Sequence, residues 1–286
     1  MELFKKGVEP GDVRQGKLAN CYFLSTLAAM AETPGRIESL FNTKTVNAAG
    51  IYSLNFYING VRQEVIVDDW IPCDSKSKLP CFAYSADIGE IWAMLAEKAW
   101  AKLHGSYSMV RRGSCITAMP HLTGAPALRF DHNLLEDMEQ FWRMLSDSAQ
   151  RSYICTGSTY ENDFNEASAG SPAKKRSSTI ISGHSYSILS VHQVKSQGSK
   201  VKLVKLRNPH GMGIEWDGDW SDNSDKWTPK LRKDCGSEVD TNDGTFFMAL
   251  PDYVENFRCT CINFESLSAK TNTLEHDFDI QDRDDE

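Results

Sequence analysis

The segment from Cys21 to Glu32 is rich in helix formers and apolar almost all round. A helix without a polar face must be covered on every side, so this segment predicts a buried helix around which the rest of the chain packs. Cys21 stands in its first turn, where free backbone N–H groups and the helix dipole stabilise a reactive thiolate. Gln15 offers a neutral donor to an oxyanion beside that sulfur. A cysteine among apolar residues is also often an inert core residue, so both interpretations stay open here.

The composition is typical of a soluble globular protein. With 286 residues, 41% of them hydrophobic and 24% charged, the chain can form one large or two medium domains. Its net charge of -8 argues against a general nucleic-acid binder. No apolar run reaches the roughly 20 residues that span a bilayer, and the N-terminus lacks the apolar part of a secretory signal. These features predict a cytoplasmic protein without a transmembrane segment.

The eight cysteines form no C-x-x-C pair and no regular framework, which disfavours a zinc finger or a disulfide scaffold. Cys259 and Cys261 would share one face of a strand as two buried positions.

The pattern changes from helical to strand-like part-way along the chain. Helices are predicted at residues 35–41, 90–103 and 135–146, a hairpin at 50–68, and strands at 152–157, 185–194, 201–208, 245–249 and 258–264. Thr123-Gly124-Ala125-Pro126 breaks the pattern and is the candidate hinge between the halves. Residues 161–178, with Lys174-Lys175-Arg176, predict an exposed loop whose basic triplet is solvated charge.

A nucleophilic cysteine needs an oriented base. His184 stands at the entry to a predicted strand, where its ring can project into a cleft. Asn208 ends another strand, where its amide oxygen could accept a proton from His184 and so hold the ring. Taken singly, His184 is also compatible with a strand-edge histidine, and Asn208 with a turn residue before proline.

Three short motifs join these residues into one pattern. Gln-Gly-x-Leu-x-x-Cys ends at Cys21, Gly-His-x-Tyr-Ser contains His184, and Arg-Asn-Pro-x-Gly contains Asn208. In this order, with the histidine 163 residues after the cysteine, they resemble the protease core of the calpains. The resemblance covers about residues 5–264 and includes segments 67–69, 97–102, 215–222 and 243–248.

The resemblance implies a papain-like α+β fold in two lobes with an active cleft between them. Residues 1–124 would form a helical lobe, residues 125–265 an antiparallel β lobe, and residues 266–286 an acidic, disordered tail.

The family's catalytic roles map onto four residues. Cys21 would attack a peptide carbonyl, His184 would act as base and then as acid, and Asn208 would orient His184. Gln15 and the backbone N–H of Cys21 would form the oxyanion hole.

Calpain cores also carry calcium sites that draw the lobes together. In the first lobe, the ligands map to the carbonyls of Lys5 and Gly7 and to the carboxylates of Asp12 and Glu90. This oxygen set suits Ca²⁺. Alternatively, Asp12 caps a turn and Glu90 begins a helix.

The second-lobe calcium site is less complete. Glu215, Asp222 and Asp243 keep carboxylates at family positions, whereas Thr245 stands where a Glu is expected. Fewer anionic oxygens predict weaker binding. The Arg that pairs with that Glu in the family would fall at Pro10, so we expect lobe closure to be coupled differently here.

Three departures surround the candidate nucleophile and base. Ala19-Asn20 replaces Gly-Asp before Cys21, Tyr22 replaces the following Trp, and His210 replaces the Trp that shields the His–Asn pair in the family. Because His210 is smaller and titratable, we expect weaker shielding and a modest activity that is sensitive to pH near the histidine range.

The sequence therefore predicts a calcium-stimulated cysteine endopeptidase that makes limited cuts in protein substrates. The alternative is a catalytically weak or inactive calpain-like scaffold that binds a partner in its cleft. An acyl-transfer enzyme of the papain-like group is disfavoured by the long match to calpain motifs. Further domains or a regulatory subunit outside this chain are compatible with the resemblance.

Overall fold

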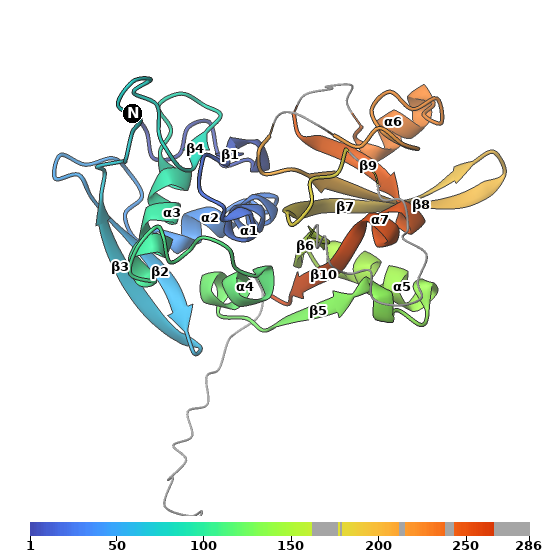
Figure 1. The fold of residues 1–286 in the computed structure, drawn as a ribbon, viewed down its shortest axis with the longest axis horizontal. Coiled ribbons are helices and arrows are strands. Elements are labelled where there is room, and N and C mark those ends of the chain that lie inside the picture. The colour runs from blue at the N-terminus through green and yellow to red at the C-terminus, as the bar shows by residue number, and fades with distance from the viewer. Residues whose placement is uncertain (162–176, 178, 212–214, 238–242, 266–286) are drawn as a thin grey trace, which may run out of the picture.

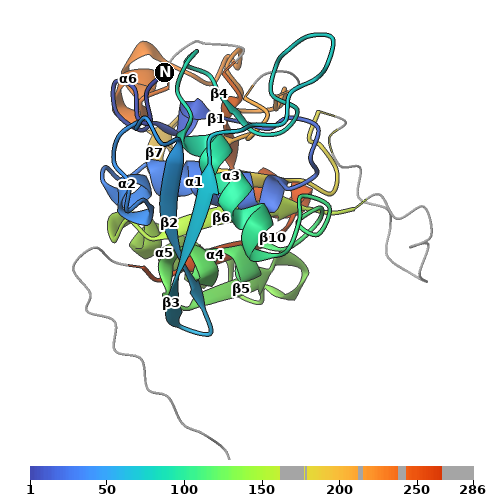
Figure 2. The same ribbon diagram turned by 90° about the vertical axis from the view of Figure 1, so that its left-hand side faces the viewer.

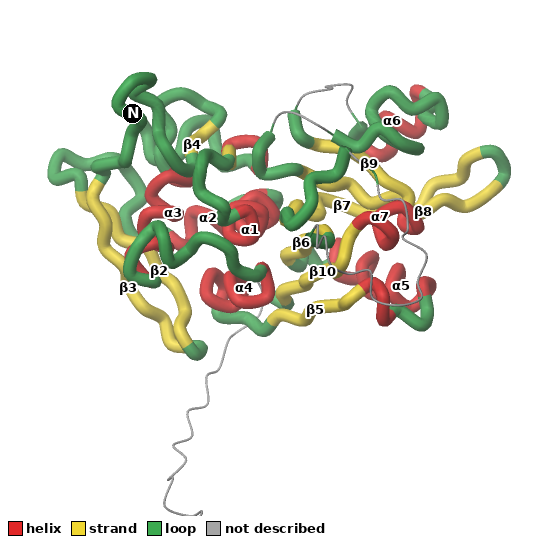
Figure 3. The backbone as a smooth tube through the Cα atoms, viewed as in Figure 1, coloured by secondary structure: helices red, strands yellow, loops and turns green. Residues whose placement is uncertain are grey.

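The computed structural model describes residues 1–161, 177, 179–211, 215–237 and 243–265. It is an α+β fold, in which α1 to α4 and the β2–β3 hairpin lie on one side and the six-stranded sheet with α5, α6 and α7 on the other, as Figures 1 and 3 show. The predicted fold class is confirmed. The predicted tail at 266–286 and nearly all of the predicted loop at 161–178 lie outside the described residues.

The first lobe is mainly helical and carries one long hairpin. Its elements are η1 (Pro10–Asp12), β1 (Val13–Arg14), α1 (Cys21–Ala31), α2 (Arg36–Leu40), β2 (Ile51–Ile58), β3 (Val61–Asp68), β4 (Tyr84–Ser85), α3 (Trp92–Leu103) and α4 (Cys115–Thr123). The predicted hairpin is confirmed, with Ile58 opposite Val61 across the Asn59-Gly60 turn.

The second lobe is built on a six-stranded antiparallel sheet with the order β5-β10-β6-β7-β8-β9. Its elements are β5 (Ala127–Asp131), η2 (His132–Leu134), α5 (Met138–Gln150), β6 (Ile154–Thr159), β7 (Ser185–Ser196), β8 (Ser199–Arg207), α6 (Pro229–Cys235), β9 (Thr245–Ala249), α7 (Leu250–Asn256) and β10 (Phe257–Asn263).

The apolar segment after Cys21 is the buried helix that its composition predicts. Every residue of α1 from Tyr22 to Ala31 is buried. Figures 1 and 2 show α1 in the middle of the molecule, where it packs against α4 of its own lobe and against β6 and β7 of the other. Phe23 stacks on Trp100 with ring centroids 4.8 Å apart. The helix thus belongs to both lobes, and its first residue reaches their boundary.

Some elements differ from the prediction. The helix expected at 135–146 begins at Met138, because Asp137 caps it by accepting hydrogen bonds from the backbone N–H groups of Glu139 and Gln140. The short helices α4, α6 and α7 were not predicted. In α4 the internal Pro120 weakens the helical pattern, and α6 and α7 have only seven residues each, too few for a clear apolar periodicity.

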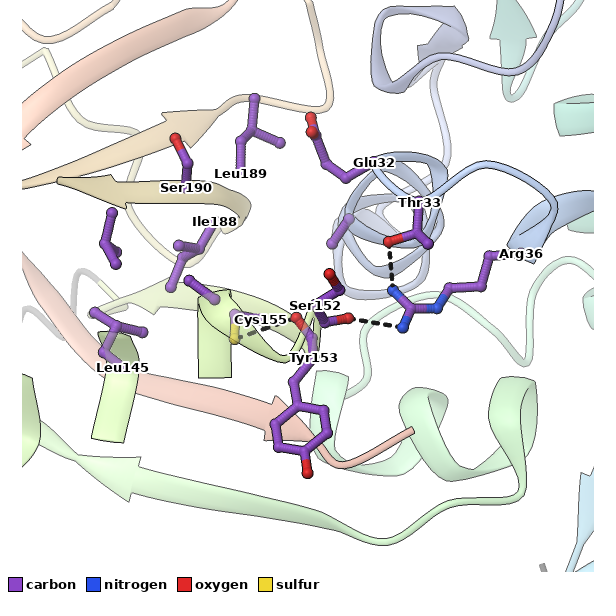
Figure 4. Close-up of a pocket in the computed structure, with 13 residues that line it drawn as sticks. Glu32, Thr33, Arg36, Leu145, Ser152, Tyr153, Cys155, Ile188, Leu189 and Ser190 are labelled. Atoms are coloured by element: carbon purple, nitrogen blue, oxygen red, sulfur yellow. Dashed lines mark hydrogen bonds between the residues drawn. The ribbon is translucent and has the colours of Figure 1, made fainter. Parts of the chain in front are cut away.

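Arg36 links the two lobes near the C-terminal end of α1, and its side chain is 3% exposed. Figure 4 shows its guanidinium donating to the hydroxyl of Thr33 and to the carbonyl of Ser152, and it also pairs with Glu265 at 2.5 Å. A cavity of about 230 Å³ lies beside it, at the C-terminal end of α1. In the described part of the chain, no helix is both long and apolar enough to span a bilayer.

Candidate active site

Cys21 is the first residue of α1 and lines a cavity of about 590 Å³ together with His184. The two residues come from different lobes, so the cavity is a cleft across the lobe boundary. Burial raises the pKa of the Cys21 thiol, and contacts with Ser185 partly oppose this effect. Among the described residues, no hydrogen bond joins Cys21 to His184. The thiol and its candidate base therefore share a cavity without forming an ion pair.

His184 is held by Asn208, as the sequence predicts. His184 immediately precedes β7 and Asn208 immediately follows β8, and these strands are neighbours in the sheet. The Nε2 atom of His184 lies 2.9 Å from Oδ1 of Asn208, and both side chains are buried. An Nε2–H that donates to this oxygen leaves Nδ1 to accept a proton. Burial lowers the pKa of His184 to about 4, so the ring is neutral at pH 7.

His210 covers the candidate base despite being smaller than tryptophan. Its ring stacks on that of His184 with centroids 4.8 Å apart and an interplanar angle of 14°. Its backbone N–H donates to Oδ1 of Asn208 at 3.0 Å. The stacked imidazole covers one face of the His184 ring, and the weaker shielding expected from a ring smaller than tryptophan stays a prediction.

The stacked histidines predict an altered response to acid. Burial lowers the pKa of His210, so it is neutral at pH 7 and becomes charged only under more acidic conditions. A charge stacked on His184 would oppose formation of its imidazolium. The His210→Trp variant is therefore expected to gain several-fold in kcat/KM under acidic conditions relative to pH 7.5. A pH profile of peptide hydrolysis measures this, with His192→Gln as a control away from the cleft. Superimposable profiles for wild type and His210→Trp would refute the idea.

Asn20 anchors the start of α1 in the core. Its Nδ2 donates to Glu97 at 2.7 Å, and the other carboxylate oxygen of Glu97 accepts from the backbone N–H of Ala83 at 2.9 Å. Both side chains are buried, and burial raises the pKa of Glu97 to about 7. The asparagine that departs from the family pattern thus has a specific partner. Sequence reasoning placed Glu97 in a motif but gave it no role, because its partner lies 77 residues away.

Tyr22 also has a specific role. Its hydroxyl accepts from Nε1 of Trp100 at 3.1 Å and donates to the carbonyl of Val110 at 3.1 Å. A Cβ atom on Gly113 would lie 2.5 Å from the Tyr22 ring, so only glycine fits there. Tyr22 therefore fixes the wall of the cleft next to Cys21.

Gln15 lies in the loop before α1 but does not line the cavity around Cys21. Its Nε2 donates to the carbonyl of Leu18 at 2.8 Å, and its backbone N–H donates to the carbonyl of Pro209 at 2.9 Å. The side chain must leave Leu18 before it can reach an oxyanion, so its role stays a prediction.

Three of the predicted first-lobe calcium ligands, Lys5, Asp12 and Glu90, lie close together. Glu90 is 1% exposed, and its two oxygens accept from the backbone N–H of Lys5 and from the hydroxyl of Ser85. Burial and then the nearby charge of Asp12 raise its pKa. Burial is also the main cause that raises the pKa of Asp12. A buried carboxylate, Glu90, beside a half-buried one, Asp12, both with raised pKa values, is a suitable place for a cation.

The predicted second-lobe ligands are held by protein groups. Glu215 accepts from the backbone N–H of Gly244, and Asp243 accepts from that of Thr245. Asp222 and Asp243 line one small cavity together with Lys205, whose ammonium group opposes a metal cation there. Over the described residues, no group of three or more His, Cys, Asp or Glu side chains is arranged to hold a metal ion.

All eight cysteines are free, in agreement with the sequence prediction. Cys259 and Cys261 both lie in β10 and are buried. Cys259 is a second thiol that lines the cleft, and its place there was not predicted because β10 is far from Cys21 in the sequence.

Comparison with known proteins places this geometry in a family. The model of the calpain family cysteine protease matches residues 1–263. The chain belongs to the calpain family of cysteine proteases. It is 35% identical over 262 residues to the calpain-type cysteine protease DEK1 of Arabidopsis thaliana, and 32% identical over 263 residues to calpain-9 of Homo sapiens. Each match covers 90% of this chain. The chain spans 12% of the length of the plant calpain and 36% of that of the human one.

Proposed function

We propose that this chain is the catalytic core of a calcium-stimulated cysteine endopeptidase that cuts proteins at limited sites. The observation that carries the proposal is His184, which lines the same cavity as Cys21 and is held by Asn208 at 2.9 Å. A thiol, a neutral imidazole and an orienting amide are the groups that acyl transfer to cysteine requires.

The proposed reaction uses these groups in two steps. Nδ1 of His184 takes the thiol proton while Sγ of Cys21 bonds to the peptide carbonyl carbon. His184 then gives the proton to the leaving amine as the C–N bond breaks. In the second step a water attacks the thioester, His184 takes its proton and returns it to the departing sulfur. Asn208 keeps the ring oriented throughout, and the backbone N–H of Cys21 with Gln15 stabilises the oxyanion.

Calcium stimulation is proposed for the first lobe. The carboxylates of Asp12 and Glu90 and the carbonyls of Lys5 and Gly7 would hold the ion, which would supply positive charge beside the buried Glu90 and the half-buried Asp12. The missing hydrogen bond between Cys21 and His184 supports a resting arrangement that needs a further adjustment before reaction. The second lobe carries Lys205 beside its carboxylates and is not assigned an ion.

A catalytically weak or inactive calpain-like scaffold is the second candidate. Two observations favour it: the raised pKa of Cys21, and the absence of a hydrogen bond between Cys21 and His184 among the described residues. Such a protein would bind segments of a partner in the same cleft without cutting them.

Labelling with an epoxide inhibitor separates the two candidates. We expect the inhibitor to modify Cys21 at least about ten-fold faster with calcium than with a chelator, as followed by mass spectrometry. Glu90→Gln should lose the calcium effect, whereas Glu136→Gln, an exposed carboxylate, should retain it. Calorimetry should detect one class of calcium site, and strong cooperativity between two sites would contradict the first-lobe assignment. Absence of calcium-dependent labelling would favour the scaffold.

A further inference from the structure

The cleft that contains Cys21 and His184 is unusually rich in arginine for a chain with a net charge of -8. Arg112, Arg129 and Arg258 line it, whereas the described residues contribute one carboxylate, Glu161. We propose that this cleft selects acidic protein segments, with Arg112 and Arg258 as the residues that determine specificity. The inference rests on the proposed function, since it names the substrate class of the same site.

The three arginines come from separate parts of the fold. Arg112 precedes α4, Arg129 lies on β5 and Arg258 lies on β10. Figure 1 shows these three elements meeting below α1, at the boundary of the lobes. Their convergence on one cavity is therefore a product of the tertiary fold and not of a local run of basic residues.

Arg112 occupies a backbone conformation that favours glycine. Its φ angle is 59°, in the left-handed region that non-glycine residues rarely adopt. Its backbone N–H donates to the carbonyl of Ala19 at 2.7 Å, two residues before Cys21. A strained backbone at a functional cleft points to a role for the side chain that it carries.

Arg112 and Arg258 are both exposed, and neither guanidinium has a hydrogen-bond or ion-pair partner within the described part of the chain. Each therefore presents its N–H donors to the cleft. A guanidinium can bind a carboxylate through two parallel hydrogen bonds, which makes Glu and Asp side chains the matching ligands.

Arg129 has a different role, because its charge is partly balanced. Its Nε donates to Asp131 at 3.0 Å, and its Nη2 contacts the same oxygen at 2.5 Å. A hydrogen bond from Cys261, followed by the charges of Arg129 and Arg258, lowers the pKa of the Cys259 thiol in the cleft wall. The positive potential of the arginines thus reaches the buried Cys259 that lines the same cleft.

Among the described residues that line the cleft, one carboxylate, Glu161, stands against three arginines. His184 is neutral at pH 7 because burial lowers its pKa to about 4. An acidic segment would therefore meet Arg112 and Arg258 as unpaired cations, while a basic segment would be repelled.

The test uses pairs of fluorogenic peptides that are identical except for Glu or Gln at positions on either side of the cleaved bond. The full chain is expected to show about ten-fold higher kcat/KM for the best Glu peptide than for its Gln partner. This ratio should shrink as salt rises from about 0.05 to about 0.5 M. Arg112→Gly combined with Arg258→Gln should bring the ratio close to one. Arg111→Gln, the same change of charge one residue outside the cavity, should leave it unaltered.

A binding measurement without turnover tests acidic selection independently of protease activity. Fluorescence anisotropy with the Cys21→Ser variant compares the same peptides without turnover. Tighter binding of Glu peptides with no cleavage by the wild type would support acidic selection and contradict the protease. Cleavage of Glu and Gln peptides at equal kcat/KM would overturn the inference and leave the protease intact. The proposed acidic selection would also be overturned if Glu and Gln peptides bound equally well. The same holds if Arg111→Gln lowered the Glu/Gln ratio as much as the combined Arg112→Gly and Arg258→Gln change.

Discussion

Replacement of Cys21 by serine is expected to lower kcat/KM for peptide hydrolysis by about 10⁴-fold or more. The hydroxyl is far less acidic than a thiol, and a neutral His184 with a pKa of about 4 is too weak a base to activate it. Fluorogenic peptide hydrolysis measures the loss, and epoxide labelling should disappear with it. Circular dichroism should be unchanged, because one sulfur atom is exchanged for oxygen at the end of a long helix.

Two other cysteines provide the controls. Cys73 is exposed and lies outside the cleft, so Cys73→Ser should behave as wild type. Cys259→Ser removes the second cleft thiol and should keep the labelling of Cys21. Activity that survives Cys21→Ser but is lost in Cys259→Ser would move the nucleophile to β10 and end the assignment.

The second large effect concerns stability and comes from the buried Glu97. Its pKa is raised to about 7 in the folded chain, compared with the ordinary value of 4.5, because burial disfavours its charged form. Between these pH values the folded state binds more protons than the unfolded state. Stability is therefore expected to fall by on the order of 3 kcal/mol as the pH rises from 4.5 through 7. Urea unfolding midpoints across this range measure the decline.

Glu97→Gln should remove most of this pH dependence. A neutral amide cannot ionise, and Asn20 can turn its own amide to match, since its Oδ1 is buried without a hydrogen bond among the described residues. Measured against the wild type at the same pH, the variant should therefore compare more favourably in stability at pH 8 than at pH 5. Glu136→Gln, at an exposed position, is the matched control. A wild-type midpoint that does not change with pH would show that Glu97 ionises normally.

Much of the fold followed from local patterns in the sequence. The α1 helix, the β2–β3 hairpin and five of the six strands of the second-lobe sheet were predicted because apolar periodicity and turn residues are local signals, whereas β5 was not predicted. The calpain family membership was predicted from ordered motifs and is confirmed. The short helices α4, α6 and α7 were not predicted, because their helical character depends on tertiary packing.

The candidate site was predicted as a set of residues but not as an arrangement. The sequence by itself determined that Cys21 begins a buried helix and that His184 and Asn208 lie at strand ends. Only the tertiary structure decided that His210 stacks on His184, that Glu97 holds Asn20, and that three arginines line the cleft. These contacts join residues that lie far apart in the chain or depend on side-chain orientation, and no local pattern encodes either. The calcium ligands, the oxyanion role of Gln15 and the cytoplasmic location stay predictions. The physical reason for the division is that periodicity reports which face of an element is buried, whereas packing decides what that face meets.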